Sequence, residues 1–492
     1  MTTQESQAVF PSEFVWGAAT SAYQIEGAFD QDGRGRSIWD TFAHTAGTTY
    51  RGDTGDVACD HYNRLDEDLD LIAELGLSSY RFSVAWSRVQ PDGVAVNQKG
   101  LDFYERLVDG LLERDVSPAL TLYHWDLPES LEQLGGWQSR DTTERFAEYA
   151  AIVAHRLGDR VPIWMTINEP WVAAWVGYGM GVHAPGIKDL TAAATAHHHL
   201  LLAHGRAVSV LREILPDPAM VGLALSLMTV RPASDDPADV AAAAIVDAQF
   251  NLSCADAVFK GEYPANLDGF SDVWNDPHGP CHPGDMELIS TPIDMLGVNS
   301  YHARTVAAPR RLEIHRASGL VGTYNESFAF GMDCVDVVPF DAPKTATGWP
   351  INPDGMTELL MRLHHRYGVP LYVTENGIAL HDYAAPDGTV DDRERVGYLT
   401  DYLLAVRDAM RQGADVRGYY VWSLLDNFEW SGGYAPRFGL IYVDYPTGER
   451  IPKSSFEFYR EVIAGYSIAS ERADLAVALP APPTRRPEGE RK

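Results

Sequence analysis

Two glutamates of this chain each follow an apolar run and precede a turn former. Glu375 comes after residues 371–374 and is followed by Asn-Gly, while Glu169 comes after residues 161–167 and one asparagine and is followed by a proline. Each run predicts a buried strand that stops abruptly near its glutamate. One such glutamate alone is most simply a salt-bridged residue at a strand end. Two of them predict a pair of carboxylates facing one pocket, the minimum equipment for acid/base or nucleophilic attack on a glycosidic bond.

A regular alternation of elements would hold these two residues in place. Apolar runs predict strands at residues 14–20, 79–86, 117–126, 161–167, 221–228, 293–301, 371–375 and 416–422. Between them, apolar residues at helical spacing predict helices at residues 64–76, 100–114, 142–157, 192–215, 238–259, 355–367 and 393–412. Eight strands alternating with helices is the count of an α/β protein built as a single (β/α)₈ TIM barrel.

The loops indicate where function should lie. Connections that follow the predicted strands are longer and richer in aromatic and polar residues than those that precede them, which favours a site on the C-terminal face. We expect the longest loop, residues 306–347, to form part of the pocket rim. Residues 1–10 predict a flexible leader and residues 11–468 one catalytic barrel domain. Residues 469–492, rich in Ala, Pro, Arg and Glu, predict a disordered tail.

Composition narrows the possible functions. The formal net charge of −30 argues against nucleic-acid binding, which relies on clustered Lys and Arg. The polar N-terminus indicates no secretory signal, and no apolar run has the length of a membrane span. The cysteines are scattered, which predicts free thiols rather than a zinc site or disulfides at Cys59, Cys254, Cys281 and Cys334. We therefore expect a cytoplasmic protein with no nucleic-acid or membrane partner.

The residues near the ends of the predicted strands form a distinctive chemical set. Amide, imidazole, carboxylate and indole groups gather there, at Gln24, Arg81, His124, Trp125, Asn168, Glu169, Asn299, Tyr301, Glu375, Trp422, Glu429 and Trp430. Together these groups can hydrogen-bond several hydroxyls and stack on the apolar face of a sugar. Such a set is typical of a carbohydrate site.

Six stretches of the chain resemble glycoside hydrolase family 1, the β-glucosidase family. They are FVWGAATSAYQIEG (14–27), YRFSVAWSR (80–88), YHWDLP (123–128), TINEP (166–170), VTENG (373–377) and NFEWSGGYAPRFGL (427–440), and they occur in the family's order. The resemblance covers the chain from about residue 10 to 465. It implies a barrel fold and a retaining, double-displacement mechanism through a covalent glycosyl-enzyme. We expect no cofactor and no metal.

The resemblance also implies roles for the catalytic residues. Glu375 matches the nucleophile that attacks the anomeric carbon, and Arg81 and the hydroxyl of Tyr301 match the groups that hold it ionised. Glu169 matches the acid/base that protonates the leaving oxygen and later deprotonates water, so its pKa must lie higher. Asn299 is expected in the same catalytic group. Retention requires the two carboxyl groups to lie about 5 to 5.5 Å apart.

Further positions match the family's substrate-binding residues. Those expected around the terminal sugar are Gln24, His124, Asn168, Trp422, Glu429 and Trp430. Two further residues are expected to bind the substrate, Trp125 and Phe438. Among them, Asn168 should matter most in the transition state, through the 2-hydroxyl of the sugar. The Glu429 carboxylate would repel a phosphate, which argues against 6-phosphosugars as substrates.

The outer part of the site is less well defined by the resemblance. Trp349 matches the family's aglycone-site tryptophan, and we expect Trp171 and Val176 to line the entrance. Some family members differ from this chain at Ser300, Gly432 and Pro436. The shape of the subsite walls and the substrate preference therefore stay open.

Two conspicuous runs have simpler interpretations. Residues 197–199 are three histidines with a fourth at His204, but consecutive positions on a helix point in different directions, so we expect solvated or capping histidines rather than a metal site. An acidic run predicts a solvated helix face at Asp66, Glu67, Asp68 and Asp70.

These observations predict an exo-acting retaining β-glycosidase. We expect a β-glucosidase with some β-galactosidase and β-fucosidase activity, acting on small β-glycosides or short oligosaccharides. A transglycosylase would use the same residues, and the sequence does not separate the two. A catalytically silent sugar-binding protein is disfavoured because both glutamates are present.

Overall fold

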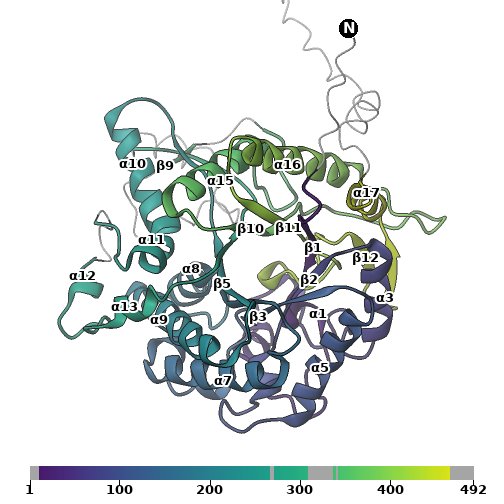
Figure 1. Ribbon diagram of the computed structural model, residues 1–492, viewed down its shortest axis with the longest axis horizontal. Coiled ribbons are helices and arrows are strands. Elements are labelled where there is room, and N and C mark those ends of the chain that lie inside the picture. Colours follow the sequence, from purple (N-terminus) through teal and green to yellow (C-terminus); the bar gives the residue numbers. More distant parts are fainter. Residues whose placement is uncertain (1–9, 266, 268–270, 309–335, 339–341, 466–492) are drawn as a thin grey trace, which may run out of the picture.

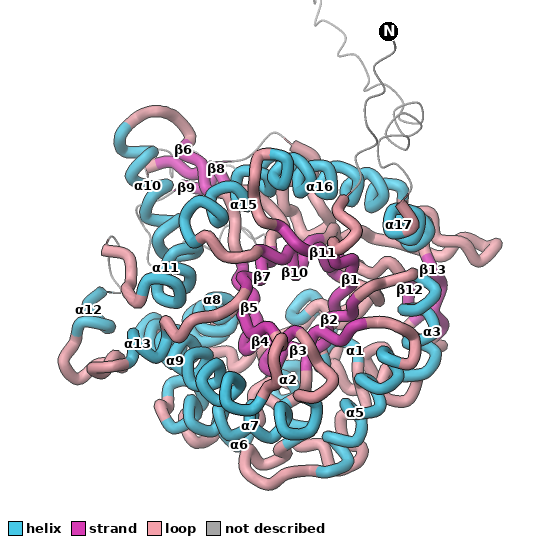
Figure 2. Tube along the Cα trace, in the orientation of Figure 1, coloured by secondary structure: helices cyan, strands magenta, loops and turns pink. Residues whose placement is uncertain are grey.

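The computed structural model describes residues 10–265, 267, 271–308, 336–338 and 342–465. Its centre is a closed barrel of parallel strands surrounded by helices, as Figure 1 and Figure 2 show. The strands follow one another around the barrel as β1 (Val15–Ala19), β11 (Val416–Trp422), β10 (Leu371–Asn376), β7 (Met295–Asn299), β5 (Met220–Ser226), β4 (Ile163–Asn168), β3 (Ser117–Tyr123) and β2 (Ser79–Ser83). These are the eight predicted strands, so the predicted (β/α)₈ barrel is confirmed.

The strands form because both of their faces are buried, which suits continuous apolar runs. One apolar cluster fills the barrel interior and includes Ala119, Met165, Ala224 and Met295. A larger cluster lies between the strands and the helices. Small residues in the interior leave room for large ones: a Cβ on Gly17 would lie 2.2 Å from the ring of Tyr420. The barrel is therefore a packed core and not a pore.

The outer ring consists of amphipathic helices that bury one face against the strands. Its main members are α3 (Leu65–Leu75), α5 (Gln98–Leu112), α7 (Asp141–Leu157), α9 (Leu190–Ile214), α10 (Pro237–Asp247), α11 (Ser253–Lys260), α15 (Pro353–Tyr367), α16 (Arg393–Arg411) and α17 (Ser454–Ile463). The helix predicted at 238–259 is interrupted by a π-helical turn at Ala248–Leu252. No helix was predicted at α17, which follows the last strand and completes the ring beside α3 and α16.

Shorter elements occupy the connections between the barrel strands and the main helices. The helical ones are α1 (Ala22–Ile25), α2 (Ile38–Ala43), α4 (Trp86–Val89), α6 (Glu129–Glu132), α8 (Pro170–Ala174), α12 (Ser271–Asn275) and α13 (Asp285–Ile289). Two small sheets consist of β12 (Ile441–Asp444) with β13 (Glu449–Pro452), and of β6 (Val230–Pro232), β8 (Arg304–Ala307) and β9 (Asp336–Val338). Only residues 76–78 separate α3 from β2, whereas residues 20–64 separate β1 from α3. The prediction of longer loops at the C-terminal face agrees with this pair.

Several predictions fall on residues outside the described range. They are the tail at 469–492, the leader at 1–10 apart from its last residue, and most of the loop 306–347. Within the described residues, no helix combines the length and the apolar character needed to span a membrane. Cys59, Cys254 and Cys281 are free thiols, as predicted, and Cys334 lies outside the described residues.

The histidine-rich stretch of α9 corrects one prediction. His197, His198, His199 and His204 are buried, with at most 4% of any of them exposed, rather than solvated. Each ring finds a partner inside the protein; His198, for example, lies 2.9 Å from the Tyr263 hydroxyl and 3.0 Å from an Asp285 carboxylate oxygen. The long helix α9 packs against both α8 and α13, so more than one of its faces is covered. Helical periodicity alone does not show which polar faces of a helix become buried.

The acidic run on α3 requires a similar correction. Asp66, Glu67 and Asp70 are exposed, as predicted, but Asp68 is fully buried. Its carboxylate accepts hydrogen bonds from Arg450 at 2.9 and 3.0 Å and lies 2.7 Å from His61 Nδ1. A buried carboxylate is stable there because a cation from the distant β13 strand compensates its charge.

Candidate active site

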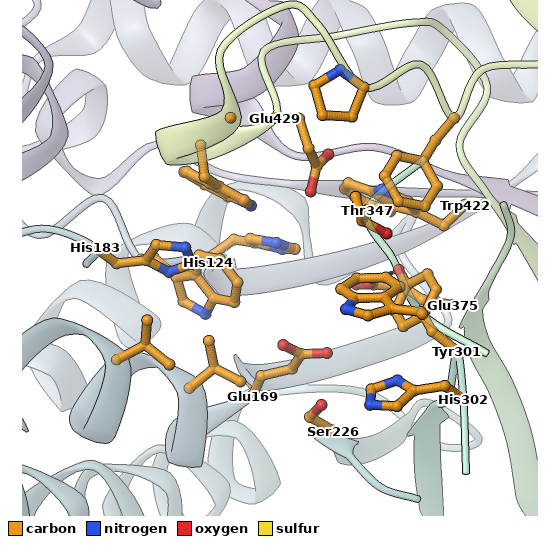
Figure 3. Close-up of a pocket in the computed structure, with 18 of the residues that line it drawn as sticks. His124, Glu169, His183, Ser226, Tyr301, His302, Thr347, Glu375, Trp422 and Glu429 are labelled. Carbon is orange, nitrogen blue, oxygen red and sulfur yellow. Dashed lines mark hydrogen bonds between the residues drawn. The ribbon is translucent and has the colours of Figure 1, made fainter. Parts of the chain in front are cut away.

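A cavity of about 230 Å³ opens at the C-terminal end of the barrel. Figure 3 shows side chains from several strands and loops arranged around it. Its lining includes the predicted residues His124, Trp125, Glu169, Val176, Tyr301, Trp349, Glu375, Trp422, Glu429, Trp430 and Phe438. The predicted pair of glutamates therefore shares one cavity, because β4 and β10 end at the same face of the barrel.

Glu375 lies at the end of β10 in a strongly polar setting. Its Oε1 accepts a hydrogen bond from Arg81 Nη1 at 2.6 Å, and its Oε2 accepts one from the Tyr301 hydroxyl at 2.7 Å. The glycine that follows allows β10 and β11 to approach closely at this point, since a Cβ on Gly377 would lie 1.8 Å from the Trp422 carbonyl oxygen. The cation and the hydroxyl together fix the positions of both carboxylate oxygens.

Glu169 lies where β4 turns into α8, and its environment differs. Its backbone is left-handed, with φ of 48°, and it precedes Pro170 at the first position of α8. The Asn299 amide donates to its Oε1 at 2.8 Å. Burial and the negative charge of nearby Glu375 raise its pKa to about 8. Glu169 is thus poised to carry a proton at neutral pH, whereas Glu375 is paired with a cation.

A hydrogen-bond network beneath the cavity links the two glutamates. Asn168 Oδ1 accepts from Arg81 Nη2 at 2.7 Å and from Asn299 Nδ2 at 3.0 Å. Asn299 Oδ1 in turn accepts from the Thr374 hydroxyl at 2.7 Å. These residues come from β2, β4, β7 and β10, so the relative position of the two carboxylates is set by four rigid strands and not by a loop.

Aromatic rings form one wall of the cavity. The ring of His124 lies parallel to those of Trp422 and Trp430, with centroids 5.9 Å apart in each case. Trp125 packs against Trp430 with centroids 4.6 Å apart. Both of these tryptophans have positive φ, 80° for Trp125 and 52° for Trp430, a conformation that costs free energy and is found most often at functional sites.

Glu429 brings a third carboxylate to the cavity from the loop after β11. Figure 3 shows it approaching from the side opposite Glu169. Burial and the charge of Glu375 raise its pKa to about 8. Within the described part of the chain, its Oε2 is buried and has no hydrogen-bond partner. An unpartnered buried carboxyl oxygen is costly and indicates that a ligand completes its hydrogen bonding.

The outer part of the cavity is mostly apolar. Trp349 stacks on His302 with centroids 5.3 Å apart, and Val172, Val176 and Phe250 also line it. Trp171, which was predicted at the entrance, does not line the cavity. It is 1% exposed and packs against Phe250 with centroids 4.5 Å apart. That prediction was wrong by one residue, because the first turn of α8 points Val172 and not Trp171 toward the opening.

Four predicted residues lie behind the cavity wall rather than on it. Arg81, Asn168 and Asn299 belong to the network described above. Gln24 is fully buried, with its amide nitrogen 3.0 Å from both Asn427 Oδ1 and the Phe428 carbonyl oxygen. In this structure Gln24 fixes the segment that carries Glu429 and does not itself reach the cavity.

Several lining residues were not identified from the sequence. They are Val172, His183, Ser226, Phe250, His302, Arg304, Ala346 and Thr347, together with Gly432 and Pro436, which the sequence analysis noted only as variable positions. Ser226 ends β5 and His302 follows Tyr301, so the rule of polar residues at strand ends could have found both. Phe250 lies in the π-helical turn within a predicted continuous helix, and nothing in its spacing marks it.

The described residues contain no group of His, Cys, Asp and Glu side chains able to hold a metal ion.

A closed parallel barrel with two glutamates at strand ends, one paired with an arginine and one with a raised pKa, defines an enzyme that uses paired carboxylates at the C-terminal face.

Sequence comparison specifies this class further. Residues 6–467 match the family described as Glycosyl hydrolase family 1, and the chain therefore belongs to that family. Among similar proteins, β-glucosidase A of Acetivibrio thermocellus is 44% identical over 461 residues, covering 93% of this chain and 99% of that protein. A bifunctional β-D-glucosidase/β-D-fucosidase of Bifidobacterium breve is 45% identical over 470 residues, covering 93% and 99%.

Solved structures agree with this assignment. The psychrophilic β-glucosidase of Micrococcus antarcticus superposes with a TM-score of 0.87 at 46% identity, covering 93% of this chain and 97% of that one. The family 1 β-glucosidase of Thermotoga maritima in complex with isofagomine lactam gives a TM-score of 0.85 at 42% identity, covering 93% and 98%.

Proposed function

We propose that this protein is an exo-acting retaining β-glycosidase that removes terminal β-D-glucosyl residues from small β-glycosides and short oligosaccharides. One observation carries the proposal: Glu169 and Glu375 face one cavity from the ends of two barrel strands in contrasting environments. Membership of glycosyl hydrolase family 1 and the β-glucosidases among the relatives support it.

In the first step, Glu375 attacks the anomeric carbon and forms a glycosyl ester while the bond to the leaving oxygen breaks. Arg81 and Tyr301 hold its two oxygens, so the nucleophile is oriented for attack. Glu169 gives its proton to the leaving oxygen, a role suited to a carboxyl group with a raised pKa. The aglycone departs as an alcohol, a phenol or a shorter sugar.

In the second step, a water molecule replaces the aglycone. Glu169, now ionised, takes a proton from this water, whose oxygen attacks the anomeric carbon and releases Glu375. Formation of the ester has removed the charge on Glu375 that raised the pKa of Glu169, so the same residue can act as a base. Two inversions give net retention, and we expect the carboxyl groups about 5 to 5.5 Å apart.

The cavity lining suggests how the sugar binds. Glu429 would accept hydrogen bonds from hydroxyls at the end of the sugar remote from the cleaved bond, while Trp422 and Trp430 supply apolar surfaces. A third carboxylate disfavours substrates that carry a phosphate at that end. One of the similar proteins is named a glucosidase and fucosidase, and we propose the same breadth for this chain.

The test is to replace Glu375 with alanine and to follow hydrolysis of 4-nitrophenyl β-D-glucoside. Turnover should be lost, and sodium azide should restore cleavage by giving a glycosyl azide of inverted configuration. Glu358→Ala is a matched control, since this glutamate forms an exposed ion pair with Arg231 on the outside of the barrel. Unchanged turnover by Glu375→Ala would refute the proposed mechanism.

The same assay separates hydrolysis from transglycosylation. Release of 4-nitrophenol and of free glucose is compared as an acceptor alcohol or sugar is added. We expect equal release without acceptor, which identifies a hydrolase. A deficit of glucose that grows with acceptor would show that the glycosyl-enzyme is intercepted, which would identify a transglycosylase using the same residues.

We also propose that the enzyme acts in the cytosol. The free thiols of Cys59, Cys254 and Cys281 support a reducing compartment. Cell fractionation with the 4-nitrophenyl β-D-glucoside assay tests this, and activity confined to the medium or the envelope would contradict it.

A further inference from the structure

Six charged side chains form one line of alternating sign beside the cavity. We call them the charge chain: Arg437, Asp426, Lys453, Asp382, Arg395 and Asp392. Arg437 donates to Asp426 at 2.7 Å. Lys453 Nζ donates to Asp426 at 2.7 Å and to Asp382 at 2.5 Å. Arg395 donates to Asp382 at 2.7 Å and pairs at its other end with Asp392.

The charge chain is buried and electrically balanced. The exposed fraction of its side chains is 0% for Lys453, Asp426 and Asp392 and at most 13% for the others. Three cations alternate with three anions, so each charge has an opposite neighbour. Charges this deep are tolerated only when they are paired and hydrogen-bonded, and each member therefore depends on the position of the next.

Lys453 is the link between two loops of the active site. Asp382 lies in the connection that follows β10 and its Glu375, and Asp426 lies in the connection that follows β11 and carries Glu429. Lys453 itself precedes α17 and does not line the cavity. Its ammonium group therefore fixes the distance between the two loops from outside the site.

Other bonds fasten both loops to the same point. The Gly439 amide donates to Asp426 at 2.9 Å, and Arg395 donates to the Arg437 carbonyl oxygen at 2.8 Å. The backbones of Leu380 and Arg437 exchange hydrogen bonds of 3.0 and 3.1 Å. Phe438, which lines the cavity, stands between two of these residues.

Two features of the Glu429 loop are unfavourable by themselves. Glu429 has a buried oxygen without a partner in the described part of the chain, and Trp430 has a backbone φ of 52°. Other contacts must offset them, and they include the bonds of Gln24 to the loop and the packing of Trp430 on Trp125. The nearest fully buried ionic bonds are those of Asp426, three positions before Glu429.

We propose that Lys453 is a positioning residue for sugar recognition: by bridging Asp382 and Asp426, it holds the Glu429 loop at the correct distance from Glu375. The inference rests on the proposed function, because the sugar must span both loops. Losing Lys453 should therefore weaken recognition of the end of the sugar that faces Glu429 more than it weakens chemistry at the anomeric carbon.

The test compares two aryl glycosides that differ at that end. For Lys453→Met, kcat/KM for 4-nitrophenyl β-D-glucoside should fall by about tenfold, since a misplaced carboxyl group forfeits a hydrogen bond of that value. The 4-nitrophenyl β-D-fucoside, which lacks the 6-hydroxyl and has an axial 4-hydroxyl, should lose less. The ratio of the two kcat/KM values should therefore fall severalfold, mainly through the KM for the glucoside.

A double variant distinguishes positioning from stability. Lys453→Met/Asp382→Asn removes one charge of each sign and leaves the Arg437–Asp426 and Arg395–Asp392 pairs intact. It should recover much of the thermal midpoint lost in Lys453→Met but keep the low glucoside-to-fucoside ratio, because the bridge is still absent. Recovery of both quantities would show that Lys453 acts only on stability and would overturn the inference.

Two further variants complete the experiment. Lys99→Met removes an exposed lysine that lies 2.8 Å from Asp32 and should change neither the ratio nor the thermal midpoint. Asp382→Asn alone cuts one end of the bridge and should lower the ratio even if Lys453→Met does not fold. A wild-type ratio in Asp382→Asn and Lys453→Met, with Glu375→Ala inactive, would overturn the inference and leave the proposed function standing.

Discussion

The cavity and the charge chain both bury carboxylates, but the two regions differ in how many of these carboxylates are paired with a cation. In the charge chain each of Asp382, Asp392 and Asp426 is paired with a cation. The cavity holds Glu169, Glu375 and Glu429, and in the described part of the chain only Glu375, through Arg81, forms an ion pair.

The difference shows how one protein obtains both rigidity and reactivity from the same chemical group. Balanced charges fix each other's positions. Unbalanced charges raise one another's pKa values, as burial and Glu375 raise those of Glu169 and Glu429 to about 8. The cavity can donate a proton and hydrogen-bond sugar hydroxyls because its buried carboxyl groups are not all paired with cations.

The largest expected effect comes from removing the acid/base residue Glu169. Glu169→Ala should lower kcat/KM by about 10²- to 10⁴-fold for alkyl glucosides, whose leaving oxygen needs a proton. It should have far less effect on formation of the glycosyl-enzyme from 2,4-dinitrophenyl β-D-glucoside, whose leaving group departs without help. A plot of log(kcat/KM) against leaving-group pKa, made for both proteins, checks this; equal slopes would contradict the role of Glu169.

The next effect comes from removing Arg81, the cation that pairs with Glu375. Arg81→Met should lower kcat by about 10²- to 10³-fold, the value of one preorganised charged donor in an active site. Arg81 also donates to Asn168, so the loss should extend to recognition of the 2-hydroxyl. Comparing kcat for β-glucosides and 2-deoxy-β-glucosides measures this: the variant should discriminate between them less than the wild-type enzyme does.

Stability measurements sharpen the contrast between the two regions. Lys453→Met leaves Asp382 and Asp426 short of a cation and should lower the free energy of unfolding by about 3–5 kcal/mol. Glu429→Gln should instead raise it by on the order of 1–3 kcal/mol at pH 8. Denaturant unfolding of both variants tests the pair, and a stabilising Lys453→Met or a destabilising Glu429→Gln would undo the comparison.

The sign of the Glu429 effect follows from its titration. Its pKa is raised from the ordinary value of 4.5 to about 8 in the folded protein, so the folded state keeps a proton that the unfolded state releases. Stability from this group is fully present below pH 4.5 and is lost as the pH rises to about 8. The Glu429→Gln gain should accordingly vanish when unfolding is measured near pH 4.5.

The smallest effect is a shift in the pH dependence of activity. Protonated Glu169 is the active form in the first step, so kcat/KM should fall on the alkaline side with an apparent pKa near 8. The charge of Glu375 and burial are the causes of that value. Glu375→Gln, measured by titration of Glu169 because it does not turn over, should show this pKa lowered. An unchanged value would mean that burial alone sets it.

Much of the fold could be predicted because it depends on local patterns. The strands that end at Glu169 and Glu375 are continuous apolar runs, and such runs are buried wherever they occur. The alternation with amphipathic helices predicts a parallel α/β sheet, and the count of eight strands favours a barrel. The predictions failed for Asp68 and for His197–His199, since the burial of a polar residue depends on which distant segment covers it.

The candidate site divides in the same way. The sequence by itself determined which groups are available, because a glutamate at a strand end must lie on the C-terminal face with the others. Tertiary structure alone decided their states: Arg81 reaches Glu375 across 294 positions of sequence, and Asp426 meets Lys453 across 27. The raised pKa of Glu169 and the Lys453 bridge both arise because charged groups lie within a few ångströms of each other in the protein interior. No local sequence pattern encodes that distance.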